Sequence, residues 1–246
     1  MAIQYSFVSL LDVIGYKNKI QADRDSNTED FKKKLTDSLS ILTDINEGEI
    51  SYQAISDTII LSSTDKNSFT TFLLTNAAIH RSFLKNGLFV RGGIAFAHHF
   101  KSANLTYSHA LPVSYEIEQR QAVYPRIVID KNIIEMTRSE GKLAAEADGI
   151  IKDGLICFQN GVYFVNTIQG HLEDCYAHGR SMYEEDKSFL SGKEHELAKH
   201  RWFQDFMIAI STDNLMPYIE PLSIFSGLEH NADKAKDSEH RIPAEE

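Results

Sequence analysis

The stretch LLDVIGYK at positions 10–17 joins an apolar run to an aspartate and then to a glycine. The run starts near Tyr5 and is typical of a buried strand, and Gly15 indicates a turn directly after it. A second stretch, ISDTII at positions 55–60, places Asp57 between two further runs that we expect to be strands joined by a very tight turn. Asp12 and Asp57 are therefore both expected at strand ends, with Asp57 at a hairpin tip.

The segments around these strands alternate between helical and strand patterns. Apolar residues at spacings of three and four predict amphipathic helices over residues 31–45 and 68–84. A strand is expected at 88–97, a helix at 110–122 and a strand at 126–129. This order predicts an α+β fold close to the ferredoxin-like arrangement, in which a central, mostly antiparallel sheet is flanked by helices.

The second half of the chain has weaker patterns. They predict a helix at 133–145, a hairpin at 155–168 that turns at Asn160, and helices at 172–189 and 194–210. No linker separates these elements from the first half, so we expect C-terminal helices that elaborate a single domain.

Composition bounds the domain organisation and the partners. The chain has 246 residues, of which 42% are apolar and 24% are charged, which suits one compact domain. We assign residues 1–226 to that domain and 227–246 to a charged, loose tail. The formal net charge of −10 argues against nucleic acid as a partner. Because no signal sequence or run of about 20 apolar residues is present, we expect a cytoplasmic protein with no membrane partner.

The two aspartates suggest a metal-dependent chemistry. If the first strand and the hairpin are neighbours, Asp12 and Asp57 converge beside the backbone amides of the Gly15 turn. Mg²⁺ prefers oxygen ligands, paired metals clamp attacking and leaving oxygens, and turn amides bind phosphate oxygens. The alternative is that each aspartate simply caps a turn, as aspartates often do.

Four ordered motifs resemble the class III nucleotide cyclase superfamily, and most closely the bacterial pyrimidine cyclases of the Pycsar anti-phage systems. They are DVIGYK at 12–17, SDTII at 56–60, VRGGIA at 90–95, and SYEIE at 114–118 followed by YPRI at 124–127. The resemblance implies a class III cyclase catalytic domain acting as a phosphorus–oxygen lyase. It would convert UTP or CTP to the 3′,5′-cyclic monophosphate and pyrophosphate with two Mg²⁺ or Mn²⁺ ions per site. It also implies a homodimer with composite active sites, and a separate effector protein that reads the product.

The resemblance also assigns roles to residues. Asp12 and Asp57 match the catalytic, metal-binding aspartates, and Val13 matches a position whose carbonyl faces a metal. Tyr52 lies where purine cyclases read the base, so its phenol would narrow the pocket to a single ring; the alternative is an ordinary strand aromatic. The residues expected to contact the nucleotide are Ile14, Gly15, Tyr16, Lys17, Tyr52, Ser56 and Arg91.

The chain departs from the wider superfamily on one helix. Purine cyclases usually carry an asparagine and an arginine there, whereas this chain has Pro112 and Glu116. The departure favours the pyrimidine branch but leaves the cation at the transition state open. A purine cyclase and a catalytically inactive nucleotide-binding module remain alternatives. The candidate cations are Lys17, Arg91, Lys101, Arg120 and Arg126.

Overall fold

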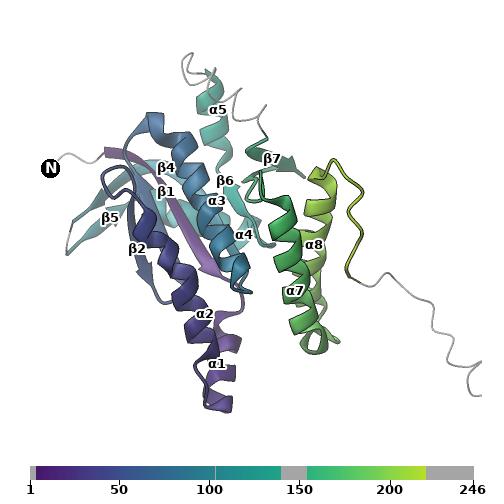
Figure 1. Ribbon diagram of the computed structural model, residues 1–246. Coiled ribbons are helices and arrows are strands. Elements are labelled where there is room, and N and C mark those ends of the chain that lie inside the picture. The colour runs from purple at the N-terminus through teal and green to yellow at the C-terminus, as the bar shows by residue number, and fades with distance from the viewer. Residues whose placement is uncertain (1–3, 103, 140–153, 220–246) are drawn as a thin grey trace, which may run out of the picture.

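The computed structural model describes residues 4–102, 104–139 and 154–219. Figure 1 shows a twisted sheet with helices packed against it. The strands are β1 (Gln4–Val13), β2 (Ser51–Ile55), β3 (Thr58–Ser63), β4 (Val90–Lys101), β5 (Thr106–Ser108), β6 (Ile127–Ile129), β7 (Ile156–Gln159) and β8 (Val162–Val165). The helices are α1 (Tyr16–Ser26), α2 (Asp30–Leu39), η1 (Ser40–Asp44), η2 (Lys66–Ser68), α3 (Phe69–Lys85), α4 (Ala110–Gln121), α5 (Lys131–Ser139), α7 (Leu172–Leu190) and α8 (Glu194–Ile210).

The strand order confirms the predicted α+β fold. The sheet runs β2-β3-β1-β4-β6-β8-β7, with β5 beside β4. Its neighbouring strands are antiparallel except for the parallel pair β4 and β6. The part β2-β3-β1-β4, with α1 to α3 in its two crossovers, is the ferredoxin-like β-α-β-β-α-β arrangement.

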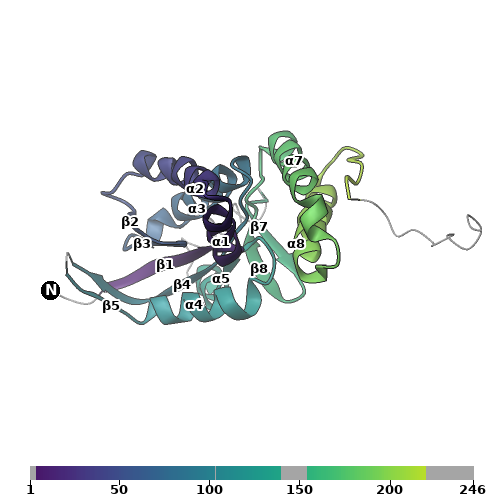
Figure 2. The same cartoon turned by 90° about the horizontal axis from the view of Figure 1, so that it is seen from below.

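The helices form layers on the two faces of this sheet, as Figure 2 shows from below. Phe7 and Leu11 of β1 point to one face and pack in a cluster with Phe31 of α2 and Phe72 of α3. Val8 points to the other face, in a cluster that includes residues of α4, α7 and α8. Because side chains alternate along a strand, Asp12 lies on the α4 face.

Helix α4 lies unusually close to the sheet at Gly93. A Cβ atom at this position would come within 2.3 Å of the backbone oxygen of Ser114 and 2.9 Å of the Cβ of Ile117. Only glycine therefore allows the helix to approach β4 this closely. The close packing carries the next residue of α4, Glu118, down to the sheet.

Several predicted boundaries need correction. Residues 16–26, for which no helix was predicted, form α1, and the single helix predicted over 31–45 is divided into α2 and η1. Strand β4 runs four residues past Ala97 and pairs with β5, which was not predicted. The turn at Asn160 is confirmed, with φ of 51° there. The predicted tail at 227–246 and the end of the helix predicted at 133–145 lie outside the described residues.

No helix among the described residues is long and apolar enough to cross a membrane.

Candidate active site

Asp12 lies one residue before the end of β1, between two partner strands. It pairs with Thr58 of β3 on one side and with Arg91 of β4 on the other. Its side chain is 24% exposed, so solvent and small ions still reach it. The Asp12 carboxylate thus projects from a central strand of the sheet, at a place where the core gives way to solvent.

Asp57 is brought beside Asp12 by the hairpin between β2 and β3. Because Ile55 pairs with Thr58, the hairpin turns through Ser56 and Asp57 alone. Ser56 adopts a left-handed φ of 60°, a conformation that a non-glycine residue adopts at some cost. The tip is tied to β1, since the Val13 amide donates to the Asp57 carbonyl at 3.2 Å. The structure therefore brings the two predicted carboxylates together.

The Gly15 turn connects β1 to α1 next to this pair. Gly15 has φ of 79°, and the Ile14 amide donates to the Phe89 carbonyl at 2.9 Å, which fixes the chain as it leaves the strand. Helix α1 starts at Tyr16, so its first backbone amides have no partner within the helix. Such a helix start attracts phosphate oxygens.

Arg91 is held by a buried carboxylate that the sequence analysis did not assign to the site. Its Nε lies 2.7 Å from Oε1 of Glu118 and 3.6 Å from Oδ2 of Asp12. The Glu118 side chain is 1% exposed, and its Oε2 accepts a hydrogen bond from Gln119 at 2.6 Å. Burial raises the pKa of Glu118, although Arg91 opposes this. Glu118 thus fixes the guanidinium beside Asp12.

The pKa of Asp12 is raised to about 6. Burial is the largest cause, and the charges of Glu118 and Asp57 add to it, whereas Arg91 lowers the pKa. An ionised Asp12 is therefore costly in the folded chain without a cation. This cost is absent below the ordinary aspartate pKa, grows as the pH rises toward about 6, and is complete above it.

Asp12→Asn is expected to stabilise the metal-free protein at pH 7 by about 1–3 kcal/mol, because it removes this cost. Urea unfolding of both chains checks the value, and the difference should shrink toward zero near the ordinary aspartate pKa of about 4. Mn²⁺ should stabilise the wild type and have little effect on the variant. A variant that is less stable than wild type at pH 7 would contradict this electrostatic account.

Two carboxylates fit a Mg²⁺ or Mn²⁺ site that the substrate completes. The described residues contain no group of three or more histidine, cysteine, aspartate or glutamate side chains placed to hold a metal ion. Mg²⁺ usually binds one or two carboxylates and takes its remaining ligands from water and substrate phosphates. Asp12 and Asp57 would hold such ions, and the Val13 carbonyl is the predicted third protein ligand.

The structure does not bring Tyr52 to this site. Tyr52 pairs with Leu61, and its ring packs against the core cluster on the opposite face of the sheet from Asp12. The expected contact of this phenol with the base is therefore corrected, because the alternation along β2 turns it away. Gln53 pairs with Ile60 and shares the face of Asp12.

The predicted nucleotide-binding residues around the start of α1 lie in different surroundings. The Tyr16 ring packs against Phe31 with 5.5 Å between ring centroids. Lys17 is exposed at the start of the helix. Ile14 packs partly into the core on the α4 face.

Two of the candidate cations have structural partners. Arg126 is 8% exposed, and its guanidinium lies 5.5–5.7 Å from the ring centres of Tyr124, Phe164 and Trp202. Lys101 donates at 2.9 Å to the hydroxyl of Ser51 and to the carbonyl of the next residue. Arg126 therefore stabilises the fold and is not free to move to a phosphate, whereas Lys101 is exposed.

Arg120 is the exposed cation on α4. It makes an ion pair of 2.9 Å with Glu116 one helical turn earlier, and its side chain is 76% exposed. An exposed pair of this kind contributes little to stability, so Arg120 can exchange Glu116 for another anion.

Comparisons with known proteins give a distant likeness in shape. No family model and no curated protein matches the sequence. Among solved structures, a guanylyl cyclase aligns with 67% of this chain and 92% of its own, at 11% identity and a TM-score of 0.42. A bacterial light-regulated adenylyl cyclase aligns with 74% of this chain and 58% of its own, at 15% identity and a TM-score of 0.44. At these values the likeness does not assign an activity to this chain.

Proposed function

We propose that this chain is a nucleotide cyclase that converts UTP or CTP to the 3′,5′-cyclic monophosphate and pyrophosphate. The observation that carries the proposal is the tie between the Val13 amide and the Asp57 carbonyl. It sets the Asp57 hairpin against the end of β1, so that two carboxylates and the start of α1 share one edge of the sheet. A metal-bound triphosphate needs this combination of hard anionic ligands and backbone donors.

Each group of site residues has its own role in the proposed reaction. Asp12 and Asp57 bind the metal complex of the triphosphate, and the amides that follow Gly15 orient its β- and γ-phosphates. The 3′-oxygen then attacks the α-phosphorus in line, its bond forms as the bond to pyrophosphate breaks, and the hydroxyl proton leaves to solvent water. Bound divalent ions acidify the hydroxyl and neutralise charge on the leaving oxygens. Glu118 holds Arg91 beside Asp12, where the charge of Glu118 raises the pKa of Asp12 and the guanidinium of Arg91 lowers it.

The pyrimidine preference is supported by the four motifs and by the residues at Pro112 and Glu116. Incubation with each of the four ribonucleoside triphosphates and Mn²⁺, followed by chromatography and mass spectrometry, tests it. Cyclic UMP or cyclic CMP is the expected product. Cyclic AMP or cyclic GMP as the main product would make the chain a purine cyclase instead.

Gln53, rather than Tyr52, is expected to influence the choice of base, because it lies on the face of Asp12. Gln53→Ala should change the ratio of pyrimidine to purine turnover. Tyr52→Ala should leave that ratio unchanged and lower the free energy of unfolding by about 1–2 kcal/mol, since it removes a ring packed against the core. Turnover of all four triphosphates, together with urea unfolding, separates the two effects. A changed ratio in a stable Tyr52→Ala chain would place the phenol back in the base pocket.

The proposed enzyme is a cytoplasmic homodimer whose product is read by a separate effector protein in an anti-phage response. Exposed apolar side chains on α4 support the dimer, because this helix packs on the face of the sheet that carries Asp12. A second copy placed there would cover the nucleotide and contribute Arg120 to it. The exposed side chains are Val113 (37%) and Tyr115 (54%).

A further inference from the structure

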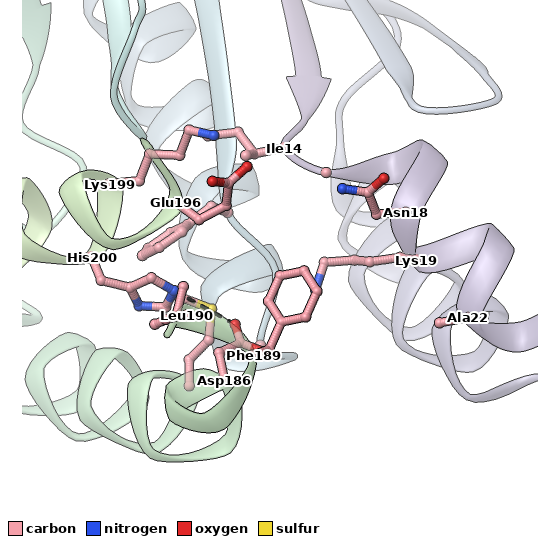
Figure 3. Close-up of a pocket in the computed structure, with 14 residues that line it drawn as sticks. Ile14, Asn18, Lys19, Ala22, Asp186, Phe189, Leu190, Glu196, Lys199 and His200 are labelled. Carbon is pink, nitrogen blue, oxygen red and sulfur yellow. Dashed lines mark ion pairs between the residues drawn. The ribbon is translucent and has the colours of Figure 1, made fainter. Parts of the chain in front are cut away.

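A second cavity lies behind the Gly15 turn, between α1, α7 and α8 (Figure 3). Its volume is about 290 Å³, near the lower end of the range for sites that bind small organic molecules. Ile14 and Gly15 line it, whereas Asp12 and Asp57 do not. The cavity is therefore a separate site that shares one wall with the predicted phosphate-binding turn.

The cavity combines an apolar wall with two lysines. Phe89 and Met182 line it from the core, and Leu190 lines it from the end of α7. Lys19 reaches it from α1 and Lys199 from α8, on opposite sides of the opening in Figure 3. A ligand with an apolar body and a charged end would match this lining, because its body would contact the apolar side chains and its charge would lie near a lysine.

His200 adds a buried polar atom that lacks a partner. The residue is 4% exposed and lines the cavity from α8. Its Nε2 lies 3.5 Å from a carboxylate oxygen of Asp186, whereas its Nδ1 is buried and makes no hydrogen bond within the described part of the chain. A buried nitrogen without a hydrogen-bond partner destabilises the chain, so a ligand that bonds to it would offset that cost.

Two lysine ammonium groups at the cavity are open to an anion. Asp186 lies beside His200, and its pKa is lowered: burial raises it, but the His200 hydrogen bond and the charges of Lys19 and other cations outweigh this. Neither Lys19 nor Lys199 makes an ion pair with a described residue, and Glu196 is the remaining carboxylate of the lining. The lining therefore holds two lysines and two carboxylates, and no ion pair within the described residues occupies the ammonium groups.

We propose that this cavity binds a small organic anion with an apolar body and a single negative group, held by Lys19 and Lys199 and hydrogen-bonded to His200. The site does not depend on the nucleotide chemistry proposed above. A ligand in it would contact Ile14 and Gly15, and would therefore restrain the turn that follows Asp12.

A matched pair of dyes tests the proposal. The anion 8-anilinonaphthalene-1-sulfonate and its uncharged analogue N-phenyl-1-naphthylamine share one apolar body and differ in the sulfonate. Fluorescence titration of the folded chain should show one anionic dye per chain, with the uncharged dye bound at least about tenfold more weakly. Lys199→Met, and independently Lys19→Met, should each weaken the anionic dye about tenfold and leave the uncharged dye unchanged.

Two further variants locate the dye. Lys33→Met removes an exposed lysine on α2 outside the cavity and should bind like wild type. Asp57→Ala should also bind like wild type, so a failure of the cyclase assignment does not affect the result. Equal affinity for both dyes, or unchanged binding in both cavity-lysine variants, would overturn the proposal. Loss of the dye in Asp57→Ala would place it in the carboxylate site and would overturn the proposal as well.

Discussion

Asp57→Ala is expected to lower cyclic nucleotide formation by at least about a thousandfold, which corresponds to about 4 kcal/mol of lost transition-state stabilisation. The same loss is expected for Asp12→Ala. Each change leaves one carboxylate to hold the cations against a highly charged triphosphate. Steady-state turnover with Mn²⁺ and the preferred triphosphate measures the effect.

The control for this experiment is Asp37→Ala, which removes an exposed acid on α2, away from the site. Asp37→Ala should retain wild-type turnover, and all three variants should keep the circular dichroism of the folded chain. Near wild-type turnover by a folded Asp12→Ala or Asp57→Ala chain would remove that aspartate from the metal site.

Complementation between two inactive chains is the second large expected effect. In the proposed composite site, the carboxylate pair comes from one subunit and Arg120 comes from the other. Asp57→Ala and Arg120→Ala should therefore each be inactive as homodimers. Random mixing would make half of the dimers mixed, each with one intact site, so activity should return to about a quarter of wild type.

Arg120 is chosen for this test because of its setting on α4. Arg126 is buried among aromatic rings, so its removal would damage the fold. Arg91 lies beside Asp12 of its own chain, so it cannot report on a partner. Sedimentation at the assay concentration provides the oligomeric state. Full activity from a monomer, or no recovery on mixing two chains that are each inactive and dimeric, would exclude a composite site.

The positions of the two aspartates were accessible from the sequence because strand ends and tight hairpins leave local patterns. The runs before Asp12 and on both sides of Asp57 have the apolar character of strands, and a two-residue connection leaves only one place for a turn. Their mutual approach was predicted on the condition that the first strand and the hairpin are neighbours, and β1 does pair with β3.

Helix α1 was missed because it has little apolar periodicity. None of its residues is buried, so no stripe of large apolar side chains marks it. Its end is set instead by Asn27, at φ of 52°, and by Asp23, whose carboxylate accepts the Phe31 and Lys32 amides at the start of α2. The hydrogen bonds that these backbone amides donate lower the pKa of Asp23, and the one from Phe31 has the largest effect. Such tertiary capping is hard to see in a sequence.

Two other features depend on which face of a strand or helix a side chain lies on, and a sequence motif does not show this. Tyr52 and Gln53 are neighbours in sequence, and only the register of β2 shows which one shares a face with Asp12. Glu118 lies within a quoted motif, but its ion pair with Arg91 requires the close approach of α4 at Gly93. The sequence did contain one signal for this ion pair: Glu118 is an acidic residue that follows Ile117 on the buried face of α4.

The most direct test of the central claim is the ratio of products from one pyrimidine triphosphate with purified wild-type chain and Mn²⁺. Mass spectrometry would measure the cyclic nucleotide, and an enzyme-coupled assay would measure pyrophosphate. The account predicts one pyrophosphate for each cyclic UMP or cyclic CMP formed, with both products abolished by Asp57→Ala. Release of inorganic phosphate or a linear nucleotide without a cyclic product would contradict it, and so would the absence of turnover with UTP and CTP.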